Sequence, residues 1–325
     1  MTTDDSFTSQ DLYFVPLGTA LGGKRDLAEL SDLDAEQVAR YRSFGYQCCR
    51  VADTDVFSLC FDAVKDSAAL AGRMNDVDLF CYAIEPNIQS SNNWMLNEQA
   101  WRKRDIRWLI QQLDIHPKRI VGLSMYNCAT FLSGIDIAAM AIRSGAASTA
   151  LSIVAGVANE HSPRIPHAFH VQSDGATGFL VTGDTSFPDG YRIVSHVIDY
   201  VNPSEFRSLD GTIDETRYFT LKALKIRDTI EGLLSRSQTA PEQLERVFVQ
   251  NLGQRAMLKY GGLCGVTEDT VWLDSLAGNA HVIGIDSLVN FHEYHQRSTL
   301  TAGRRVLIVG TSGMSWGGMV LERGH

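Results

Sequence analysis

Apolar positions along the chain alternate between helical spacing and short continuous runs, which predicts alternating helices and strands. Residues 54–72 (TDVFSLCFDAVKDSAALAG) carry apolar side chains at helical spacing between a Thr/Asp start and a Gly stop. These side chains are Phe57, Phe61, Val64 and Ala68. We therefore expect one amphipathic helix over 54–72. Residues 76–84 (DVDLFCYAI) follow as a mostly apolar run of strand length, typical of a strand covered on both faces.

The alternation of helix and strand continues to the C-terminus. In the first half we expect helices near 97–113 and 128–143 and strands at 119–124, 149–157 and 175–183. After Gly190 we expect strands near 191–200, 246–251, 304–313 and 315–322 and helices near 214–236, 253–260 and 280–296. No linker rich in Pro, Gly or Ser separates the halves. The pattern predicts an α/β fold of two similar halves, 1–185 and 186–325, with mostly parallel sheets in a single body.

Composition and charge narrow the class of protein. The 325 residues are 44% apolar and 21% charged, which excludes a disordered, fibrous or disulfide-stapled chain. The formal charge of −9 comes without any long Lys/Arg cluster, so we expect no nucleic-acid partner. The N-terminus is acidic and no apolar run approaches the roughly 18 residues that span a bilayer, so we expect a cytoplasmic protein without membrane attachment.

The six cysteines are spaced for neither zinc binding nor a C-x-x-C motif, so we expect no structural metal. Cys60 and Cys81 lie in apolar segments and are expected to be small core residues. Cys128 stands where the strand at 119–124 should turn into a helix. Free N–H groups and the positive end of the helix dipole would stabilise a thiolate there and could also hold an oxyanion. Taken alone, a buried structural thiol is the commoner interpretation.

Several motifs together resemble the beta-ketoacyl-ACP synthase III family of the thiolase superfamily. N-C-A-T-F at 127–131 is similar to that family's A-C-x-G-F nucleophile turn, and S-D-G-A-T-G-F at 173–179 to its G-D-G-A-x-A element. A-G-N-A at 277–280 resembles Y-G-N-T, and G-T-S-G-M-S-W-G-G-M-V-L at 310–321 resembles the closing G-x-G-x-x-W-G-x-x-L. Their order and intervals agree from about residue 12 to residue 322.

The resemblance implies a thiolase-like five-layered αβαβα fold with two duplicated halves, assembled as a homodimer. It also implies chemistry on acyl thioesters of coenzyme A or acyl carrier protein, with no tightly bound cofactor. Cys128 matches the nucleophile and Asn279 the Asn of a Cys-His-Asn triad. Backbone N–H groups near Gly313 or Met314, with that of Cys128, would form the oxyanion hole.

One position departs from this family's pattern. The His expected directly after a strand is Gln250, 29 residues before Asn279. A glutamine can donate or accept a hydrogen bond but cannot take a proton near neutral pH. The resemblance implies that this His and the Asn together stabilise the enolate formed when malonyl-ACP is decarboxylated. Losing one of these two donors should weaken the stabilisation of the enolate by about 100-fold or more, which puts carbon–carbon bond formation in doubt.

Other residues are candidates for the base or the substrate pocket. His281 could be the base for Cys128 or for an incoming alcohol or amine; alternatively it caps the helix that starts there and faces away. His167 and His170 could border the substrate tunnel or lie on surface loops. Trp94 and Phe131 could shape an acyl pocket, although packing explains both as well. Asp174 is expected to hold a turn through backbone hydrogen bonds.

Three functions remain open from the sequence. The first is a Cys-dependent acyltransferase, of specialised (secondary) metabolism, that passes an acyl group from Cys128 to an O, N or S nucleophile. The second is a decarboxylative ketosynthase in which Gln250 or His281 replaces the usual His. The third is a non-catalytic partner subunit that binds acyl-ACP.

Overall fold

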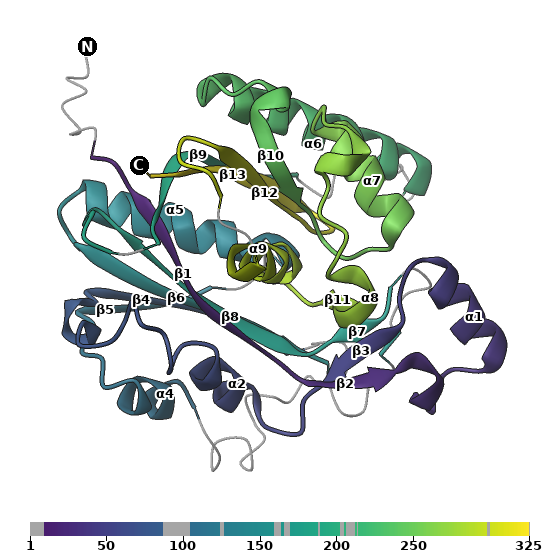
Figure 1. Cartoon of the computed structure of the whole chain (residues 1–325), viewed down its shortest axis with the longest axis horizontal. Coiled ribbons are helices and arrows are strands. Elements are labelled where there is room, and N and C mark those ends of the chain that lie inside the picture. The colour runs from purple at the N-terminus through teal and green to yellow at the C-terminus, as the bar shows by residue number, and fades with distance from the viewer. Residues whose placement is uncertain are drawn as a thin grey trace.

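The computed structural model describes residues 10–86, 105–123, 127–158, 164–165, 170–187, 189–201, 205, 212, 214–297 and 300–324. The chain forms five layers in which helices and strands alternate (Figure 1). Two outer helical layers enclose two arms of a β-sheet, and α5 (Thr130–Arg143) and α9 (Asp286–Arg297) lie between the arms. The predicted αβαβα arrangement is confirmed.

One nine-stranded sheet makes up both arms, in the order β10-β12-β13-β9-β1-β8-β6-β4-β5. The first arm contains β1 (Tyr13–Leu21), β4 (Leu79–Pro86), β5 (Arg119–Gly122), β6 (Thr149–Val157) and β8 (Gly175–Thr182). The second contains β9 (Tyr191–Tyr200), β10 (Leu244–Phe248), β12 (Arg305–Thr311) and β13 (Ser315–Arg323). In the part of the chain that the structure describes, the backbone pairing that joins the two arms is that of β1 with β9, at Tyr13 and Phe14.

Both arms repeat the same pairings. In the first arm β4 runs parallel to β6, β6 antiparallel to β8, and β8 antiparallel to β1. In the second arm β10 runs parallel to β12, β12 antiparallel to β13, and β13 antiparallel to β9. This repetition is the structural form of the two similar halves. The expectation of mostly parallel sheets is wrong, because β1, β8, β9 and β13 pair with their neighbours only in antiparallel orientation. The boundary between residues 185 and 186 stays a prediction, and it falls between β8 and β9.

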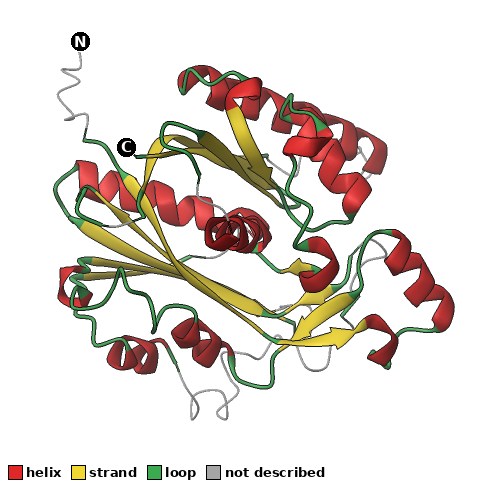
Figure 2. Cartoon of the chain, in the orientation of Figure 1, coloured by secondary structure: helices red, strands yellow, loops and turns green. Residues whose placement is uncertain are grey.

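Shorter elements surround the sheet. β2 (Gly23–Asp26) pairs with β3 (Cys48–Val51), and β7 (Gln172–Ser173) pairs with β11 (His281–Val282). The helices of the first half are α1 (Ala35–Ser43), α2 (Val56–Asp62) and α4 (Ile106–Gln112). Those of the second half are α6 (Glu215–Arg236), α7 (Gln254–Leu263) and the short α8 (Leu276–Asn279). Figure 2 shows α6 and α7 on one outside face and α2 and α4 on the other.

Three hydrophobic clusters fill the spaces between the layers. One lies beneath α2 and α4, around Leu59, Leu109 and Phe80. A second lies between the arms, where Phe131 of α5 and Phe291 of α9 are buried. The third lies under α6 and α7 and includes Ile230, Met257 and Trp316. Because β6 and β8 are covered on both faces, almost every residue in them is buried, as their continuous apolar runs predict.

Most predicted elements are confirmed within a few residues, and the strands at 149–157 and 191–200 match β6 and β9 in both bounds. The single helix expected over 54–72 is wrong in extent, because α2 ends at Asp62. Beyond it the chain continues in turns with i to i+3 hydrogen bonds, such as Ser67 N to Val64 O. Ala63, Val64, Ala69 and Leu70 are buried there, whereas Ala68, on the apolar face of the expected helix, is exposed.

The helix expected over 280–296 is also wrong at its start. Residues 281–282 form strand β11, and α9 begins at Asp286. The helix near 97–113 is described only from Asp105 onward, where α4 lies; residues 97–104 are outside the described part of the chain. Cys60 and Cys81 are buried free thiols, as predicted.

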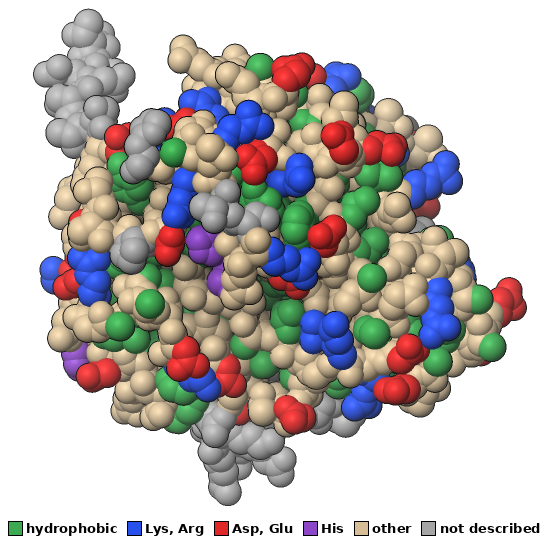
Figure 3. Space-filling view, viewed as in Figure 1, with side chains coloured by type: hydrophobic (Ala, Val, Ile, Leu, Met, Phe, Trp, Pro, Cys, Tyr) green, Lys and Arg blue, Asp and Glu red, His purple; other side chains and the backbone are tan. Residues whose placement is uncertain are grey.

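The helices and the surface charge of the molecule bear on the sequence-based expectations about membranes and nucleic acids. Among the described residues no helix is both long and apolar enough to cross a bilayer. The face shown in Figure 3 carries acidic and basic side chains interspersed with each other.

Asp174 is a buried carboxylate that ties several segments together. It accepts hydrogen bonds from the backbone N–H of Ala52 at 2.7 Å and of Ala158 at 2.8 Å, and it pairs with Arg164 at 2.8 Å. Its side chain is 1% exposed. Backbone hydrogen bonding by Asp174 is therefore confirmed, although it joins distant segments and not a single turn.

We predict that Asp174→Ala lowers the free energy of unfolding by about 3 to 5 kcal/mol, because it leaves the partly buried Arg164 cation and two N–H groups without their acceptor. Urea unfolding followed by circular dichroism measures this loss. Asp184→Ala is the matched control: Asp184 pairs with Arg73 at 2.8 Å on the surface, so its removal should cost at most about 1 kcal/mol. Equal losses in the two variants would contradict the prediction.

Candidate active site

Cys128 lies in the 3₁₀ turn Asn127–Ala129, immediately before α5 begins at Thr130. Ala129 occupies the N-cap position of α5 and has no side-chain acceptor for the first-turn N–H groups. The Cys128 side chain is partly exposed. The thiol thus sits beside the positive end of the helix dipole, an environment that favours negative charge on sulfur.

His281 is the side chain that contacts this thiol. Its Nε2 lies 3.8 Å from the Cys128 Sγ. The residue belongs to β11, where its backbone N–H donates to the Val171 carbonyl at 2.9 Å, and its imidazole is 5% exposed. Because His281 lies in strand β11 and not in the first turn of a helix, it does not cap a helix. Its ring faces the Cys128 sulfur.

Asp286 holds the other side of the imidazole. Its carboxylate Oδ2 accepts a short hydrogen bond from His281 Nδ1, and Oδ1 accepts the backbone N–H of Val282 at 2.5 Å. The side chain is fully buried. An ionised carboxylate can only accept, so Nδ1 carries the proton in this contact and Nε2 faces Cys128. Cys128, His281 and Asp286 are therefore arranged as a nucleophile, a base and an orienting acid.

Charge in the site favours the imidazolium form of His281. Burial by itself lowers the pKa of His281, but the Asp286 carboxylate and then Cys128 outweigh it and hold the pKa well above its ordinary range. A protonated imidazole 3.8 Å from sulfur stabilises a thiolate. The site is thus suited to a thiolate–imidazolium pair.

Sequence analysis assigned no role to Asp286. In the helix expected from residue 280, Asp286 would lie nearly two turns from the start, where neither a cap nor a motif singles it out. Its contact with His281 depends on the turn between β11 and α9, which the helix expected from residue 280 concealed.

Gln250 and Asn279 are both engaged in other contacts. Gln250 Nε2 donates to the Cys128 carbonyl at 3.3 Å, while its Oε1 accepts from the N–H and the hydroxyl of Thr311. Asn279 Oδ1 accepts from Arg50 Nη2 at 2.9 Å, and its Nδ2 donates to Glu293 at 2.6 Å. Among the hydrogen bonds of the described residues, neither amide side chain reaches the Cys128 sulfur.

A backbone kink separates Asn279 from His281. Ala280 between them has φ 48° and ψ −149°, a conformation that L-residues with a side chain rarely adopt. The Asn251 Nδ2 donates to the Ala280 carbonyl at 2.8 Å and holds the kink in place. The strained peptide directs the Asn279 and His281 side chains to different partners.

The end of strand β12 lies next to the turn that carries Cys128. At Gly310 a Cβ atom would come within 3.1 Å of the Cys128 carbonyl oxygen and 2.8 Å of the Phe131 ring, so the close approach requires glycine. The Gly313 carbonyl accepts from the Tyr218 hydroxyl, and the Met314 N–H lies 3.3 Å from Ser312 Oγ. An oxyanion hole at Gly313 or Met314 stays a prediction.

The remaining predicted residues divide into three groups. The His170 ring packs edge-on against His281, with centroids 4.5 Å apart, so it borders the Cys128–His281 contact. Phe131 is fully buried beneath the nucleophile turn. Trp94 and His167 lie outside the described residues. In the described part of the chain, no group of His, Cys, Asp and Glu is arranged to hold a metal ion.

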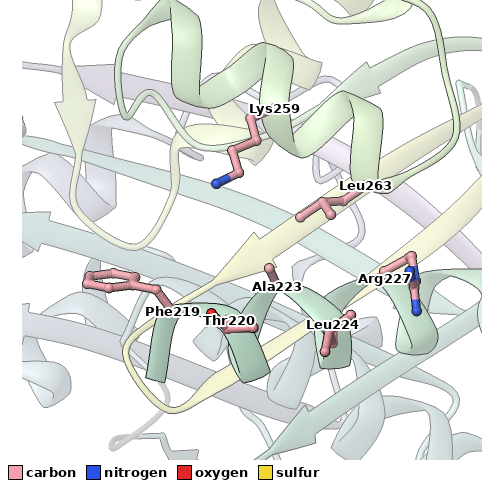
Figure 4. A pocket seen from close by; sticks show the side chains of 7 residues that line it. All are labelled: Phe219, Thr220, Ala223, Leu224, Arg227, Lys259 and Leu263. Atoms are coloured by element: carbon pink, nitrogen blue, oxygen red, sulfur yellow. The ribbon is translucent and has the colours of Figure 1, made fainter. Parts of the chain in front are cut away.

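A shallow groove of about 270 Å³ lies between α6 and α7 (Figure 4). It is lined by Phe219, Thr220, Ala223, Leu224, Arg227, Lys259 and Leu263. Neither Cys128 nor His281 contributes to it. This groove is therefore separate from the candidate active site.

Comparison with solved structures shows what the fold is similar to. The acyltransferase ChlB3 superposes with a TM-score of 0.76 at 17% identity, over 97% of this chain and 98% of that chain. The 3-oxoacyl-[acyl-carrier-protein] synthase III of Aquifex aeolicus gives 0.70 at 17% identity, over 95% and 99%. Xanthomonas campestris OleA with bound lauric acid and lauroyl-CoA gives 0.71 at 14% identity, over 95% and 99%.

These likenesses confirm the predicted thiolase-like fold, that of beta-ketoacyl-ACP synthase III. No family model and no curated protein matches the sequence.

We predict that Asp286→Asn shifts the titration of His281 to lower pH. The neutral amide removes the charge that raises the pKa of His281, which leaves burial, and burial favours the neutral ring. NMR titration of the imidazole carbons, with His281→Gln to assign the signal, measures the shift.

Asp136→Asn is the control for this titration, because Asp136 lies 3.2 Å from a different histidine, His196. That variant should leave the His281 signal unchanged. An identical titration of His281 in wild type and Asp286→Asn would show that the carboxylate does not set its charge.

Proposed function

We propose that this protein is an acyltransferase that acts on acyl thioesters of coenzyme A or acyl carrier protein and carries the acyl group on Cys128. The contact between Cys128 and His281 at 3.8 Å, backed by the buried Asp286, is the observation that carries the proposal. The likeness of the fold to acyl-transferring and condensing enzymes supports the same class of chemistry.

The first half-reaction loads the enzyme. The Cys128 thiolate attacks the thioester carbonyl carbon, and the tetrahedral oxyanion collapses by breaking the bond to the donor sulfur. The departing donor thiolate takes the proton from His281 Nε2. The products are a free donor thiol, a neutral His281 and an acyl-Cys128 thioester.

The second half-reaction transfers the acyl group. Neutral His281 Nε2 removes the proton from an acceptor hydroxyl, amine or thiol as that atom attacks the acyl-Cys128 carbonyl. The carbon–sulfur bond to Cys128 breaks, and the thiolate–imidazolium pair re-forms. Asp286 does not take the proton in either half-reaction. It stabilises the His281 imidazolium whenever Nε2 carries a proton.

Transfer to a heteroatom is favoured over decarboxylative condensation by the contacts of Gln250 and Asn279. Condensation requires hydrogen-bond donors that hold an enolate. The resemblance implies that the side chains at positions 250 and 279 would supply these donors. Gln250 instead braces the Cys128 backbone, and Asn279 bonds Arg50 and Glu293. The intact Cys128–His281–Asp286 arrangement also favours an enzyme over a silent partner subunit.

We expect acyl-CoA or acyl-carrier thioesters to add one acyl mass to the wild-type protein, as measured by intact mass spectrometry, and Cys128→Ala to lose the adduct. Cys48→Ala is the matched control, because Cys48 is the other partly exposed thiol among the described residues. That variant should load like wild type.

A chase of the loaded protein distinguishes the two reactions. Release by alcohols or amines supports acyl transfer. Release by malonyl-ACP with loss of carbon dioxide would establish condensation instead, and the absence of any Cys128 adduct would overturn the proposed function.

A further inference from the structure

Two buried asparagines that the reaction above does not use lie behind the segment that carries His281. Asn251 follows strand β10, and Asn290 belongs to α9, between the two arms of the sheet (Figure 1). Both residues are fully buried. The Asn290 Nδ2 donates to the Asn251 Oδ1 at 3.0 Å, and the Asn251 Nδ2 donates to the Ala280 carbonyl at 2.8 Å. Asn251 and Asn290 therefore form a relay from α9 to the kink at Ala280, here called the asparagine relay.

Carbonyl groups at both ends fix the orientation of the two amides. The Asn290 Nδ2 also donates to the Val249 carbonyl at 2.9 Å, and a carbonyl oxygen can only accept. The NH₂ group of Asn290 must therefore face Val249 and Asn251, and that of Asn251 must face Ala280. An amide that turned over would lose both of its hydrogen bonds, which is costly in a buried place.

The asparagine relay is an unfavourable way to fill the core. The Asn290 Oδ1 is buried, and none of the described residues donates a hydrogen bond to it. A buried acceptor without a partner lowers stability. The neighbours of Asn290 on α9, Val289 and Phe291, are apolar residues of the hydrophobic cluster between the arms. Packing alone therefore does not account for an amide at position 290.

The relay holds the peptide that leads into His281. The carbonyl of this peptide accepts from Asn251, and its N–H donates to the Val171 carbonyl at 2.9 Å. Ala280 has φ 48°, a strained value that persists only where the surroundings hold it. A peptide held at both ends fixes the direction in which the His281 side chain leaves the backbone. The His281 Nε2 then lies 3.8 Å from the Cys128 sulfur.

The same helix also holds the imidazole itself. Asp286 accepts from His281 Nδ1, and Asn290 follows Asp286 by four residues on α9, so that the two side chains share one face of the helix. α9 thus acts on the ring directly through Asp286 and on the backbone through the asparagine relay. The position of Nε2 against the sulfur depends on both contacts.

We propose that Asn251, oriented by Asn290, is a positioning residue that holds the strained Ala280 peptide so that the His281 ring stays against the Cys128 sulfur. The inference deepens the proposed function and rests on it for any effect on acyl transfer. Its effect on the thiol is independent of acyl transfer. The relay keeps Cys128 in its reactive, negatively charged form through geometry alone.

The test measures how much of Cys128 is thiolate near neutral pH. Iodoacetamide alkylates a thiolate with loss of iodide, and at about pH 10 any accessible thiol is mostly ionised. The ratio of the alkylation rates at about pH 7 and about pH 10 therefore reports ionisation and not access. Peptide mass spectrometry follows Cys128 separately from the other thiols. We expect Asn251→Leu to lower this ratio roughly 3- to 30-fold, since an unassisted thiol is only a few per cent ionised near pH 7.

Ser287→Ala is the matched control on α9. The buried Ser287 hydroxyl donates to the Val309 carbonyl at 2.8 Å, so this change also leaves a buried carbonyl without a donor. It should keep the wild-type ratio. Thermal melts establish that each variant is folded. An unchanged ratio in folded Asn251→Leu, or an equal fall in Ser287→Ala, would overturn the inference.

Two double variants keep the test decisive if Asn251→Leu does not fold. Asn251→Leu with Asn290→Leu leaves neither amide without its partner and should lower the ratio to the same extent. Asn251→Leu with Ala280→Gly should recover part of the ratio, because glycine adopts φ 48° without steric cost. An unchanged ratio in the first double variant, or no recovery in the second, would show that the relay does not act through the Ala280 peptide.

Acyl loading gives a second readout. Because Asn251 acts through His281 and not on the donor, Asn251→Leu should lower the maximal rate of loading and leave the half-saturating thioester concentration unchanged. A change confined to the half-saturating concentration would overturn the inference. If no thioester loads the wild type, the proposed function fails, while the alkylation ratio still decides the role of Asn251.

Discussion

The buried carboxylate of Asp286 is the constraint on which the rest of the site depends. It binds the backbone of β11 through the Val282 N–H and the imidazole of His281 at the same time. One charged group thereby fixes the position of the strand, the orientation of the ring and the ring nitrogen that faces Cys128. Because the carboxylate is shielded from water, its charge acts on His281 at close to full strength.

The three residues of the candidate site come from different halves of the chain. Cys128 precedes a helix that packs between the arms, whereas His281 and Asp286 follow the second arm's β10 and α8 in the chain. Gln250 connects the two regions, since it bonds the Cys128 carbonyl and Thr311 at the end of β12. Gln250, at the position where the resemblance implies a histidine, therefore holds the Cys128 backbone against the end of β12.

The order of strands and helices could be predicted because most elements lie within the layered core. Strands β6 and β9 have continuous or alternating apolar residues bounded by turn residues, and their limits were found. Periodicity failed where turns mimic a helix, after Asp62, and where a two-residue strand precedes α9. Two paired residues are too few to produce any pattern.

Residues of the candidate site could be predicted where a short sequence motif marks them, and could not where their role depends on contacts between distant segments. Cys128 and His281 were identified from motifs and from their chemistry. Asp286 was not, since its relevance arises from a contact across the turn between β11 and α9. The sequence shows that Gln250 cannot act as a base. Its hydrogen bonds to the Cys128 carbonyl and to the Thr311 N–H could not be predicted, because these segments are distant in the sequence.

Ala280 makes this arrangement vulnerable to exchange. The positive φ of Ala280 sets the directions of the Asn279 and His281 side chains, so that His281 and not Asn279 contacts the sulfur. A relaxed peptide there would present a different face of the segment to the nucleophile. A change confined to this one residue could therefore exchange the contacts of Asn279 and His281 while every layer of the scaffold stays in place.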